Sequence, residues 1–436
     1  MVKIFIETFG CSANYNNSEI MAGLLVRKNY KIVSEPRKAD LIIVNTCTVK
    51  LPTENRVKKS IRSFLKLRKK IIIAGCMPKV QKDLIREIAP KASLVGPHNI
   101  KDITEIVEKI IANKTTEKIE RKNEVKLNCP ELRKNLIIQI VQISEGCNGE
   151  CTYCIVRLAK GKLFSYPESE IVKQIESGIK DNCKEIWLTS QDTAAYGQDK
   201  NTNLVLVLKK IVVIKGDFKL RIGMMDPNNV FLILDDLIKI IKSDKIFKFL
   251  HIPVQSGNDE ILKKMKRPYT VDEFKKIIKK LRKEIPEITI STDIICGFPS
   301  ETEEQFNDSI KLIKEIKPDV LNISRFWPRP GTKAANMENQ IHGNLTKQRS
   351  QLLTKEFNKI SFEKNKKWIG WKGPVLIDEK GKDNSFVGRN YCYKPVVIKS
   401  KNNLLGKKVN VKINEVTNHT LRGEVEQSFK LSYFII

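Results

Sequence analysis

The stretch LIIQIVQISEGCNGECTYC, residues 136–154, joins an apolar, strand-like run to a loop that carries three closely spaced cysteines, Cys147, Cys151 and Cys154. Three thiolates on one loop can hold a cubane 4Fe–4S cluster. Such a cluster normally binds four cysteines, so one of its irons would keep an open position. S-adenosylmethionine (SAM) can chelate an open iron of this kind, and Tyr153 offers an aromatic face for its adenine. The loop therefore predicts a redox centre at the end of a strand.

A zinc site is one alternative for this loop, and a set of plain structural thiols is another. Structural zinc takes four ligands, usually with a second Cys or His pair at matching spacing. The nearest histidine after the loop is His251, which lies within a predicted strand. The spacing therefore favours the iron–sulfur cluster over zinc.

A second set of cysteines is dispersed along the first part of the chain. Cys11, Cys47 and Cys76 directly follow the apolar runs KIFIETFG, LIIVNT and IIIAG. If these runs are parallel strands, the three thiols meet at one carboxyl edge, where α/β sheets bind ligands. They then form a candidate second cluster site, although three unrelated buried thiols are the alternative. The remaining cysteines, interpreted as structural, are Cys129, Cys183, Cys296 and Cys392.

The order of strand-like and helix-like segments predicts an α/β protein with several domains. Strand and helix patterns alternate over residues 1–112, which indicates a parallel α/β domain, and the polar segment 113–134 is predicted to be a linker. Residues 135–367 contain six strand–helix units, typical of a partial (β/α)6 barrel, and end in a long amphipathic segment. Short β-like runs over residues 368–436 predict a small β-barrel.

The charge of the chain points to a polyanionic partner. The 436 residues carry a formal net charge of +29, and phosphate binding by basic side chains releases counterions. Residues 364–412 hold thirteen Lys or Arg against three Asp or Glu, so RNA or DNA is the expected partner. A general bias toward lysine is the alternative.

The location expected from the sequence is the cytoplasm. The sequence contains no apolar run of the roughly 18 residues that a membrane helix needs, and its beginning does not read as a signal peptide. Ten cysteines in a reducing compartment are better read as metal ligands or reactive thiols than as disulfides.

Four polar residues at or near predicted strand ends of the barrel are candidate neighbours of SAM. Arg221 can pair with a carboxylate, and Asp293 can accept hydrogen bonds from amino or ribose groups. Capping of a following helix is an equal alternative for each. The four candidates are Gln191, Arg221, Gln255 and Asp293.

Beyond these patterns, the chain resembles the radical-SAM tRNA methylthiotransferase family over nearly its whole length. The segments ETFGCSANYNNSE, NTCTV and AGCMP resemble the family's opening domain, and GCNGECTYCIVRLAKGKLFSYP resembles its SAM-cluster loop. HIPVQSGNDEILKKMKRPYT, STDIICGFPSETEEQF and SRFWPRPGT resemble its barrel strands, and the last region resembles the RNA-binding TRAM module. TSQDTAAYG and RIGMMDP are similar to the archaeal and eukaryotic branch, which acts on threonylcarbamoyladenosine.

The resemblance implies a transferase with two 4Fe–4S clusters that uses two molecules of SAM. It implies that Cys11, Cys47 and Cys76 hold the auxiliary cluster, where sulfur is methylated. A SAM-derived radical then removes hydrogen from the adenine carbon that receives the methylthio group. The implied partners are the anticodon stem-loop of tRNA and an electron-donor protein.

Three departures from the family pattern accompany this resemblance. Lys160 stands where the family usually has arginine, Arg157 where many relatives have proline, and Ser300 where glycine is frequent.

Other activities remain open at the level of the sequence. One is methylthiolation of isopentenyladenosine in tRNA or of an aspartate in a ribosomal protein. Another is a non-enzymatic RNA-binding protein whose cysteines hold a metal. If the chain is the tRNA enzyme, both cysteine triads should face one cavity that is large enough for a base.

Overall fold

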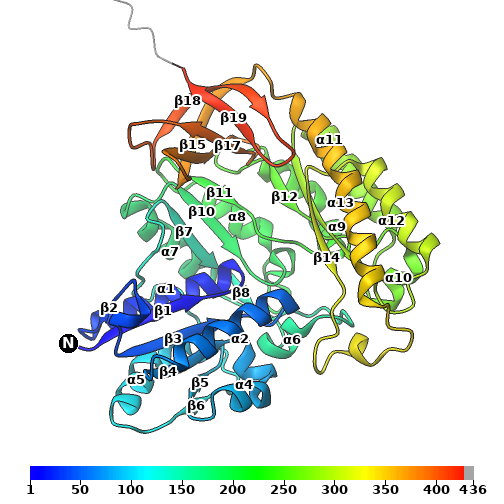
Figure 1. Cartoon of the computed structure of the whole chain (residues 1–436). Helices are drawn as coiled ribbons and strands as arrows, with labels where there is room; N and C mark the ends of the chain where they lie inside the picture. The colour runs from blue at the N-terminus through cyan, green and yellow to red at the C-terminus, as the bar shows by residue number, and fades with distance from the viewer. Residues whose placement is uncertain (427–436) are drawn as a thin grey trace, which may run out of the picture.

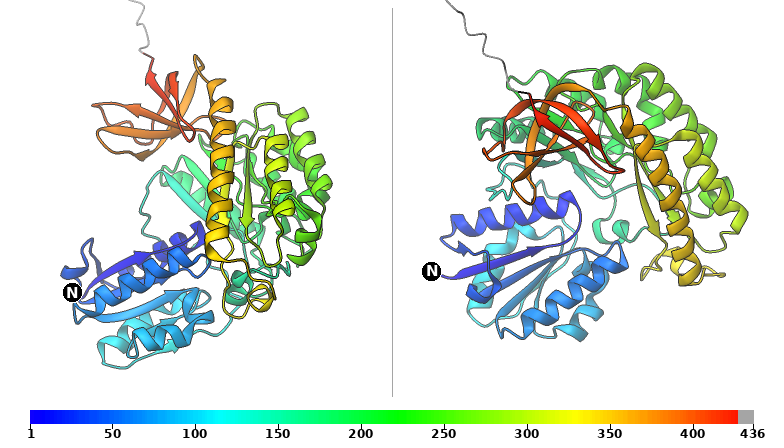
Figure 2. Two further views of the ribbon diagram at one scale, coloured as in Figure 1. Left: turned by 45° about the vertical axis from the view of Figure 1, so that its right-hand side comes forward. Right: turned by 45° about the horizontal axis from the view of Figure 1, so that its top comes forward.

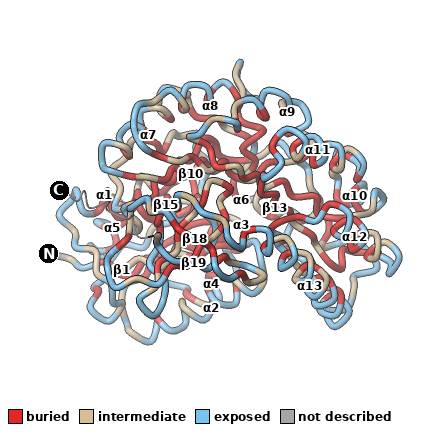
Figure 3. The backbone as a smooth tube through the Cα atoms, turned by 90° about the horizontal axis from the view of Figure 1, so that it is seen from above, coloured by how far each residue is buried: buried red, intermediate tan, exposed pale blue. Residues whose placement is uncertain are grey.

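A computed structural model describes residues 1–426 of the chain. Figure 1 shows an N-terminal sheet domain and a C-terminal barrel at opposite ends of a central half barrel. In a view from above, the strands are mostly buried, whereas the surrounding helices carry many of the exposed residues (Figure 3). The predicted α/β fold class is confirmed. No helix in the described part is both long enough and apolar enough to cross a membrane.

The N-terminal domain is a six-stranded parallel sheet with the order β2-β1-β3-β4-β5-β6. Strand β3 reads LIIVNT and is buried at every position, because helices cover both faces of the sheet. The strands are β1 (Lys3–Thr8), β2 (Lys31–Ile32), β3 (Leu41–Thr46), β4 (Lys70–Gly75), β5 (Ser93–Val95) and β6 (Glu117–Lys118). The helices are α1 (Ser12–Arg27), α2 (Leu51–Leu65), α3 (Met77–Val80), α4 (Lys82–Ile88) and α5 (Ile103–Ile111).

Segment 113–134 runs along the N-terminal domain. It contains β6, which pairs with β5, and its later part follows α1, where the Leu132 N–H donates to the Glu19 carbonyl at 2.9 Å. A Cβ atom on Gly23 of α1 would lie 2.3 Å from the Pro130 carbonyl oxygen. Glycine is therefore required there to let the segment pass.

The central domain is a half barrel of six parallel strands. Two three-stranded ladders, β7-β10-β11 and β12-β13-β14, are joined by the hydrogen bond from the Phe247 N–H to the Leu220 carbonyl at 3.0 Å. Capping boxes at Thr270 and Thr302 fix the starts of two outer helices. The strands are β7 (Ile138–Gln142), β10 (Glu185–Thr189), β11 (Lys219–Arg221), β12 (Phe249–His251), β13 (Thr289–Cys296) and β14 (Val320–Arg325), with a separate pair β8 (Ser144–Glu145) and β9 (Phe164–Ser165). The helices are α6 (Ile155–Lys160), α7 (Glu168–Lys180), α8 (Leu204–Val212), α9 (Pro227–Ile241), α10 (Asp259–Lys264), α11 (Val271–Glu284), α12 (Glu303–Ile316) and α13 (Gly343–Lys366).

The C-terminal region forms a closed five-stranded barrel, as predicted, with the order β15-β16-β17-β19-β18. Helix α13 runs along the edge of the half barrel beside β14 and leads into the C-terminal barrel (Figure 2). Buried valine and isoleucine side chains alternate with exposed residues along the strands, which fills the small core. The strands are β15 (Lys372–Lys380), β16 (Ser385–Arg389), β17 (Pro395–Lys399), β18 (Lys408–Val416) and β19 (Leu421–Val425).

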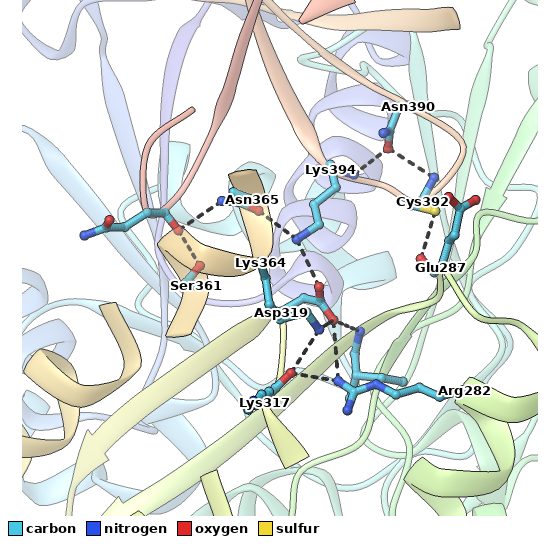
Figure 4. Close-up of polar contacts among 12 residues, drawn as sticks. Arg282, Glu287, Lys317, Asp319, Ser361, Lys364, Asn365, Asn390, Cys392 and Lys394 are labelled. Atoms are coloured by element: carbon cyan, nitrogen blue, oxygen red, sulfur yellow. Dashed lines mark hydrogen bonds and ion pairs between the residues drawn. The ribbon is translucent and has the colours of Figure 1, made fainter. Parts of the chain in front are cut away.

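A buried polar cluster, which we call the Asp319 junction, attaches this barrel to the central domain (Figure 4). Asp319 directly precedes β14 and forms ion pairs with Lys364 at 2.8 Å and Lys394 at 3.1 Å, while Arg282 lies 3.9 Å away. Lys364 comes from α13 and Lys394 from the C-terminal barrel. Since Asp319 lies before its strand, the barrel docks at the amino ends of the parallel strands.

Candidate functional site

The loop after β8 brings Cys147, Cys151 and Cys154 to one cavity of about 1360 Å³. The cavity opens at the carboxyl ends of the half-barrel strands, which is the usual position of ligand sites in such folds. Gly149 leaves space within the loop, because a Cβ atom there would lie 3.3 Å from Cys147 Sγ. Cys154 is the N-cap residue of α6, so the positive end of that helix points toward the thiols.

The surroundings of this triad suit an anionic cluster. Arg267 donates to Cys151 Sγ at 3.2 Å and also pairs with Asp226 at 2.6 Å. Burial raises the pKa of Cys147 to about 12, so a bound metal must displace the thiol proton. No three Cys, His, Asp or Glu side chains in residues 1–426 are arranged to hold a single metal ion. A cubane differs because each thiolate binds its own iron.

The second triad lies at the carboxyl edge of the N-terminal sheet, where β1, β3 and β4 end side by side. The Cys76 N–H donates to the carbonyl of Thr46, the residue before Cys47, at 3.1 Å. Gly10, with φ +111°, precedes Cys11, and a Cβ atom there would lie 3.1 Å from Cys47 Sγ. Glycine thus leaves open the space beside the sulfur that a cluster would need.

Asparagine side chains fix the loops of this triad. Asn14 donates to the carbonyls of Phe9 and Thr46, both at 2.8 Å, and Asn45 donates to the Asn14 carbonyl at 2.7 Å. These buried bonds join the first two cysteine loops and restrict their movement. Neither Asn14 nor Asn45 was predicted as a site residue, although both lie within the segments quoted from the N-terminal domain.

The two triads approach each other. Cys11 lines the same cavity as Cys147, Cys151 and Cys154, and α3, which begins after Cys76, packs against α6, which begins after Cys154. Cys47 and Cys76 are buried and do not belong to the lining.

A buried ionic group, which we call the Glu145 cluster, lies close to Cys76, since the pKa of that thiol is shifted not only by burial but also by the charges of Lys160 and Glu145. Glu145 bonds to Lys126 at 2.5 Å and Lys160 at 2.7 Å, and His98 Nδ1 lies 3.4 Å from its other oxygen. Burial would raise the pKa of Glu145, but the two lysines hold it well below its usual value. Burial lowers the pKa of Lys126 to about 8. Lysine in place of the family's arginine at position 160 therefore retains a buried cation.

Arg329 links the half barrel to the N-terminal domain. It follows β14, lines the cavity, and is 4% exposed. Its guanidinium pairs with Glu54 of α2 and donates to Thr48 Oγ1 at 3.2 Å, next to Cys47. Breaking such a buried pair costs about 3–5 kcal/mol. The segment SRFWPRPGT contains Arg329, but only the fold reveals its partners.

Four of the five candidate SAM neighbours line the cavity: Tyr153, Gln191, Gln255 and Asp293. Asp293 Oδ1 is held at 2.7 Å by His251 and by Asn322. Gln191 Oε1 accepts from the Gly146 N–H at 2.6 Å, which ties β10 to the cysteine loop.

The structure places the fifth candidate, Arg221, elsewhere. It is not a lining residue of the cavity. Its guanidinium lies over the rings of Trp187, Phe249 and Tyr393, at 5.1–5.4 Å from their centres. Tyr393 belongs to the C-terminal barrel, so Arg221 contributes to that interface.

The other predicted residues have simple surroundings. Cys183, Cys296 and Cys392 are buried, and Cys129 is half-buried. Ser300 has φ +63°, a conformation that favours the glycine found in many relatives. Arg157 lies 3.4 Å from Glu150 at the cavity.

Three family models match successive parts of the chain. A family described as "Uncharacterized protein family UPF0004" matches residues 3–96, the "Radical SAM superfamily" matches residues 141–313, and the "TRAM domain" matches residues 368–425. With the barrel and its cysteine loop, these matches define a radical-SAM enzyme with a TRAM domain.

Curated relatives give the particular family. The chain is 43% identical over 401 residues to a "Probable threonylcarbamoyladenosine tRNA methylthiotransferase" of Pyrococcus horikoshii, covering 91% of this chain and 94% of the relative. It is 40% identical over 433 residues to the "Threonylcarbamoyladenosine tRNA methylthiotransferase" of Homo sapiens, covering 97% of this chain and 74% of the relative. The chain belongs to this methylthiotransferase family.

A solved structure supports the fold alone. The radical S-adenosylmethionine methyltransferase TsrM from Kitasatospora setae, with cobalamin and a [4Fe-4S] cluster bound, superposes with a TM-score of 0.59 at 12% identity, covering 77% of each chain.

Proposed function

We propose that this chain adds a methylthio group to the adenine ring of threonylcarbamoyladenosine beside the anticodon of tRNA, using two 4Fe–4S clusters and two molecules of SAM. The observation that carries the proposal is that Cys11 of one triad lines the same cavity as the whole of the other triad. Relatives named for this activity cover the full three-domain arrangement. We also propose that a separate electron-donor protein reduces the clusters and that the protein acts in the cytoplasm.

In this proposal each triad holds one cluster. Cys147, Cys151 and Cys154 would bind the cluster that receives SAM, and the N-terminal triad would bind the auxiliary cluster. When bound, SAM and its cluster supply the radical chemistry needed to break an aromatic C–H bond, which side-chain acids and bases cannot do. Arg267 compensates the negative charge at Cys151, and Arg329 holds the N-terminal domain over the cavity.

The remaining polar residues would orient SAM. His251 and Asn322 both bond to Oδ1 of Asp293, so we assign Oδ2 to the amino or ribose groups of SAM. Tyr153 would contact the adenine ring, and Gln255, which also lines the cavity, would complete the pocket.

The substrate is tested by nucleoside analysis. A host that makes threonylcarbamoyladenosine but lacks the methylthio derivative should gain that derivative when it expresses this chain. The variant Cys151→Ala should abolish the product, and Cys129→Ala, which removes a cysteine outside both triads, should retain it. Unchanged tRNA nucleosides in cells with the folded, iron-loaded protein would refute the proposal.

The number of clusters is tested by analysis of purified, anaerobic protein. Two cubanes contain about eight irons per chain. The triple variant of Cys147, Cys151 and Cys154 to alanine should retain about half of the iron, and so should the triple variant of Cys11, Cys47 and Cys76. If one of these variants retained all of the iron, the corresponding triad would not be a cluster site.

A further inference from the structure

We infer that the outer face of α2 is a track for the phosphate backbone of the substrate RNA, an inference that rests on the proposed function. The track consists of exposed residues on one face of α2 together with the C-cap residue of the helix, Lys66. The intervals between successive track residues along the chain are four, three, one and three positions. Because an α-helix has 3.6 residues per turn, these intervals keep the side chains on one face. These residues are Asn55, Lys59, Arg62, Ser63 and Lys66.

The opposite face of α2 anchors the helix firmly. Val57, Ile61 and Phe64 are buried in the core that also contains β3. The outer residues line a shallow pocket of about 510 Å³ together with Lys58. The track is therefore a set of cations on a rigid support with a groove between them.

The cations of the track lack carboxylate partners. Among residues 1–426, no ion pair or side-chain hydrogen bond involves Lys59, Arg62 or Lys66. The acidic residue of the helix, Glu54, points inward to Arg329. In the same domain, lysines such as Lys109 and Lys118 are paired with Glu105. Unpaired cations of this kind attract phosphate, which releases counterions.

Helix α2, which carries the track, begins at the cavity. Lys50, the N-cap residue of α2, lines the cavity together with Val49, which lies two residues after Cys47. From there the 15 residues of α2 extend for about 22 Å, at about 1.5 Å per residue. An RNA whose target base enters the cavity can thus pass Lys50 and follow α2 with the nucleotides several positions away. We assign these contacts to one strand of the anticodon stem.

The test compares two triple variants that remove the same charge. Lys59→Gln with Arg62→Gln and Lys66→Gln removes the track. Lys28→Gln with Lys31→Gln and Lys114→Gln is the control, because these exposed residues also lack ion pairs among the described residues but lie at the amino ends of the N-terminal strands. Exposed substitutions of this kind change stability little, and thermal unfolding checks this for both.

The measured quantity is the salt dependence of binding to an anticodon stem-loop RNA. The slope of log K against log salt should decrease in magnitude by about 2–3 for the track variant, at about 0.7–0.9 per lost phosphate contact. The control variant should keep the wild-type slope. A short single-stranded RNA with only the target adenosine and its nearest neighbours should bind equally well to the wild type and the track variant.

Two results would overturn the inference: an unchanged slope for the track variant, or an equal decrease for both variants. In either case the proposed function stands if the wild type still modifies tRNA. If the wild type neither binds nor modifies tRNA, the proposed function fails as well.

Discussion

The Glu145 cluster and the Asp319 junction are built from the same parts, yet they lie at opposite ends of the half barrel. Each has a buried carboxylate between two lysines, at 2.5 and 2.7 Å in the first and 2.8 and 3.1 Å in the second. The Glu145 cluster lies close to Cys76. The Asp319 junction joins the half barrel to α13 and to the C-terminal barrel. A buried ion pair alone therefore does not mark a reactive site; the residues beside it do.

The largest effect is expected from Glu145→Gln. It leaves Lys126 and Lys160 buried without a counter-charge, which should lower the free energy of unfolding by about 3–5 kcal/mol. Because Cys76 is adjacent, the variant should also lose iron from the N-terminal triad. Urea unfolding and iron analysis measure the two effects. Glu105→Gln, at an exposed ion pair, is the control, and equal stability of the two variants would contradict the prediction.

Asp319→Asn should have a somewhat smaller effect on stability, about 3 kcal/mol, because the Lys364 side chain is 21% exposed and loses less when its partner is removed. Unlike Glu145→Gln, it should keep its full iron content. Limited proteolysis should cut faster between α13 and β15, as the C-terminal barrel loses its anchor. The control is Asp236→Asn at an exposed pair with Lys239. Loss of iron from Asp319→Asn would contradict the prediction that only the Glu145 cluster affects iron binding.

A lysine-to-methionine substitution in each ionic group removes one positive charge but keeps a side chain of similar length, so its effect reports mainly the loss of charge. Lys160→Met and Lys364→Met should each lower the free energy of unfolding by about 1–3 kcal/mol, since the carboxylate keeps one partner. Only Lys160→Met should alter the electron paramagnetic resonance spectrum of the reduced iron–sulfur cluster that we propose for the N-terminal triad. If Lys160→Met and the wild type gave identical spectra, the ionic group around Glu145 would have no influence on the iron–sulfur site of the N-terminal triad.

The smallest effect is a dependence of stability on alkaline pH. Burial lowers the pKa of both Lys126 and Lys364 to about 8 in the folded protein, below the ordinary value of 10.5. The unfolded chain then binds more protons between pH 8 and 10.5, so these lysines make stability rise with pH in that window. Lys364→Met should flatten this rise in thermal unfolding scans, and Lys126→Met should do the same. If stability rose between pH 8 and 10.5 as much in both variants as in the wild type, Lys126 and Lys364 would not be the source of the rise.

The sequence predicted those features of the fold that depend on short-range patterns. Cys11, Cys47 and Cys76 each follow an apolar run, and the parallel sheet brings these strand ends together. Likewise, the half barrel and the C-terminal barrel follow from the spacing of apolar runs. The closed order of the last five strands required the structure.

Long-range contacts were beyond such patterns. Arg329 and Glu54 are 275 positions apart, and nothing in the local sequence pairs them. Arg221 was predicted at the cavity because it ends a strand. However, β11 has only three residues, and in the sheet Arg221 is the neighbour of Trp187, which lies in the middle of β10. Arg221 therefore ends its strand before the height at which the cavity opens.

Docking of the C-terminal barrel at the amino ends of the strands places that barrel and the cysteine cavity at opposite ends of the half barrel. Asp293, the fifth residue of the eight-residue strand β13, lines the cavity, so the half barrel is at least about 13 Å deep between its amino end and the cavity, at 3.3 Å per residue. Any polymer that touches the barrel while presenting a base to the cysteines must bridge that depth. A mononucleoside cannot do so, which favours an intact folded nucleic acid over its free building blocks.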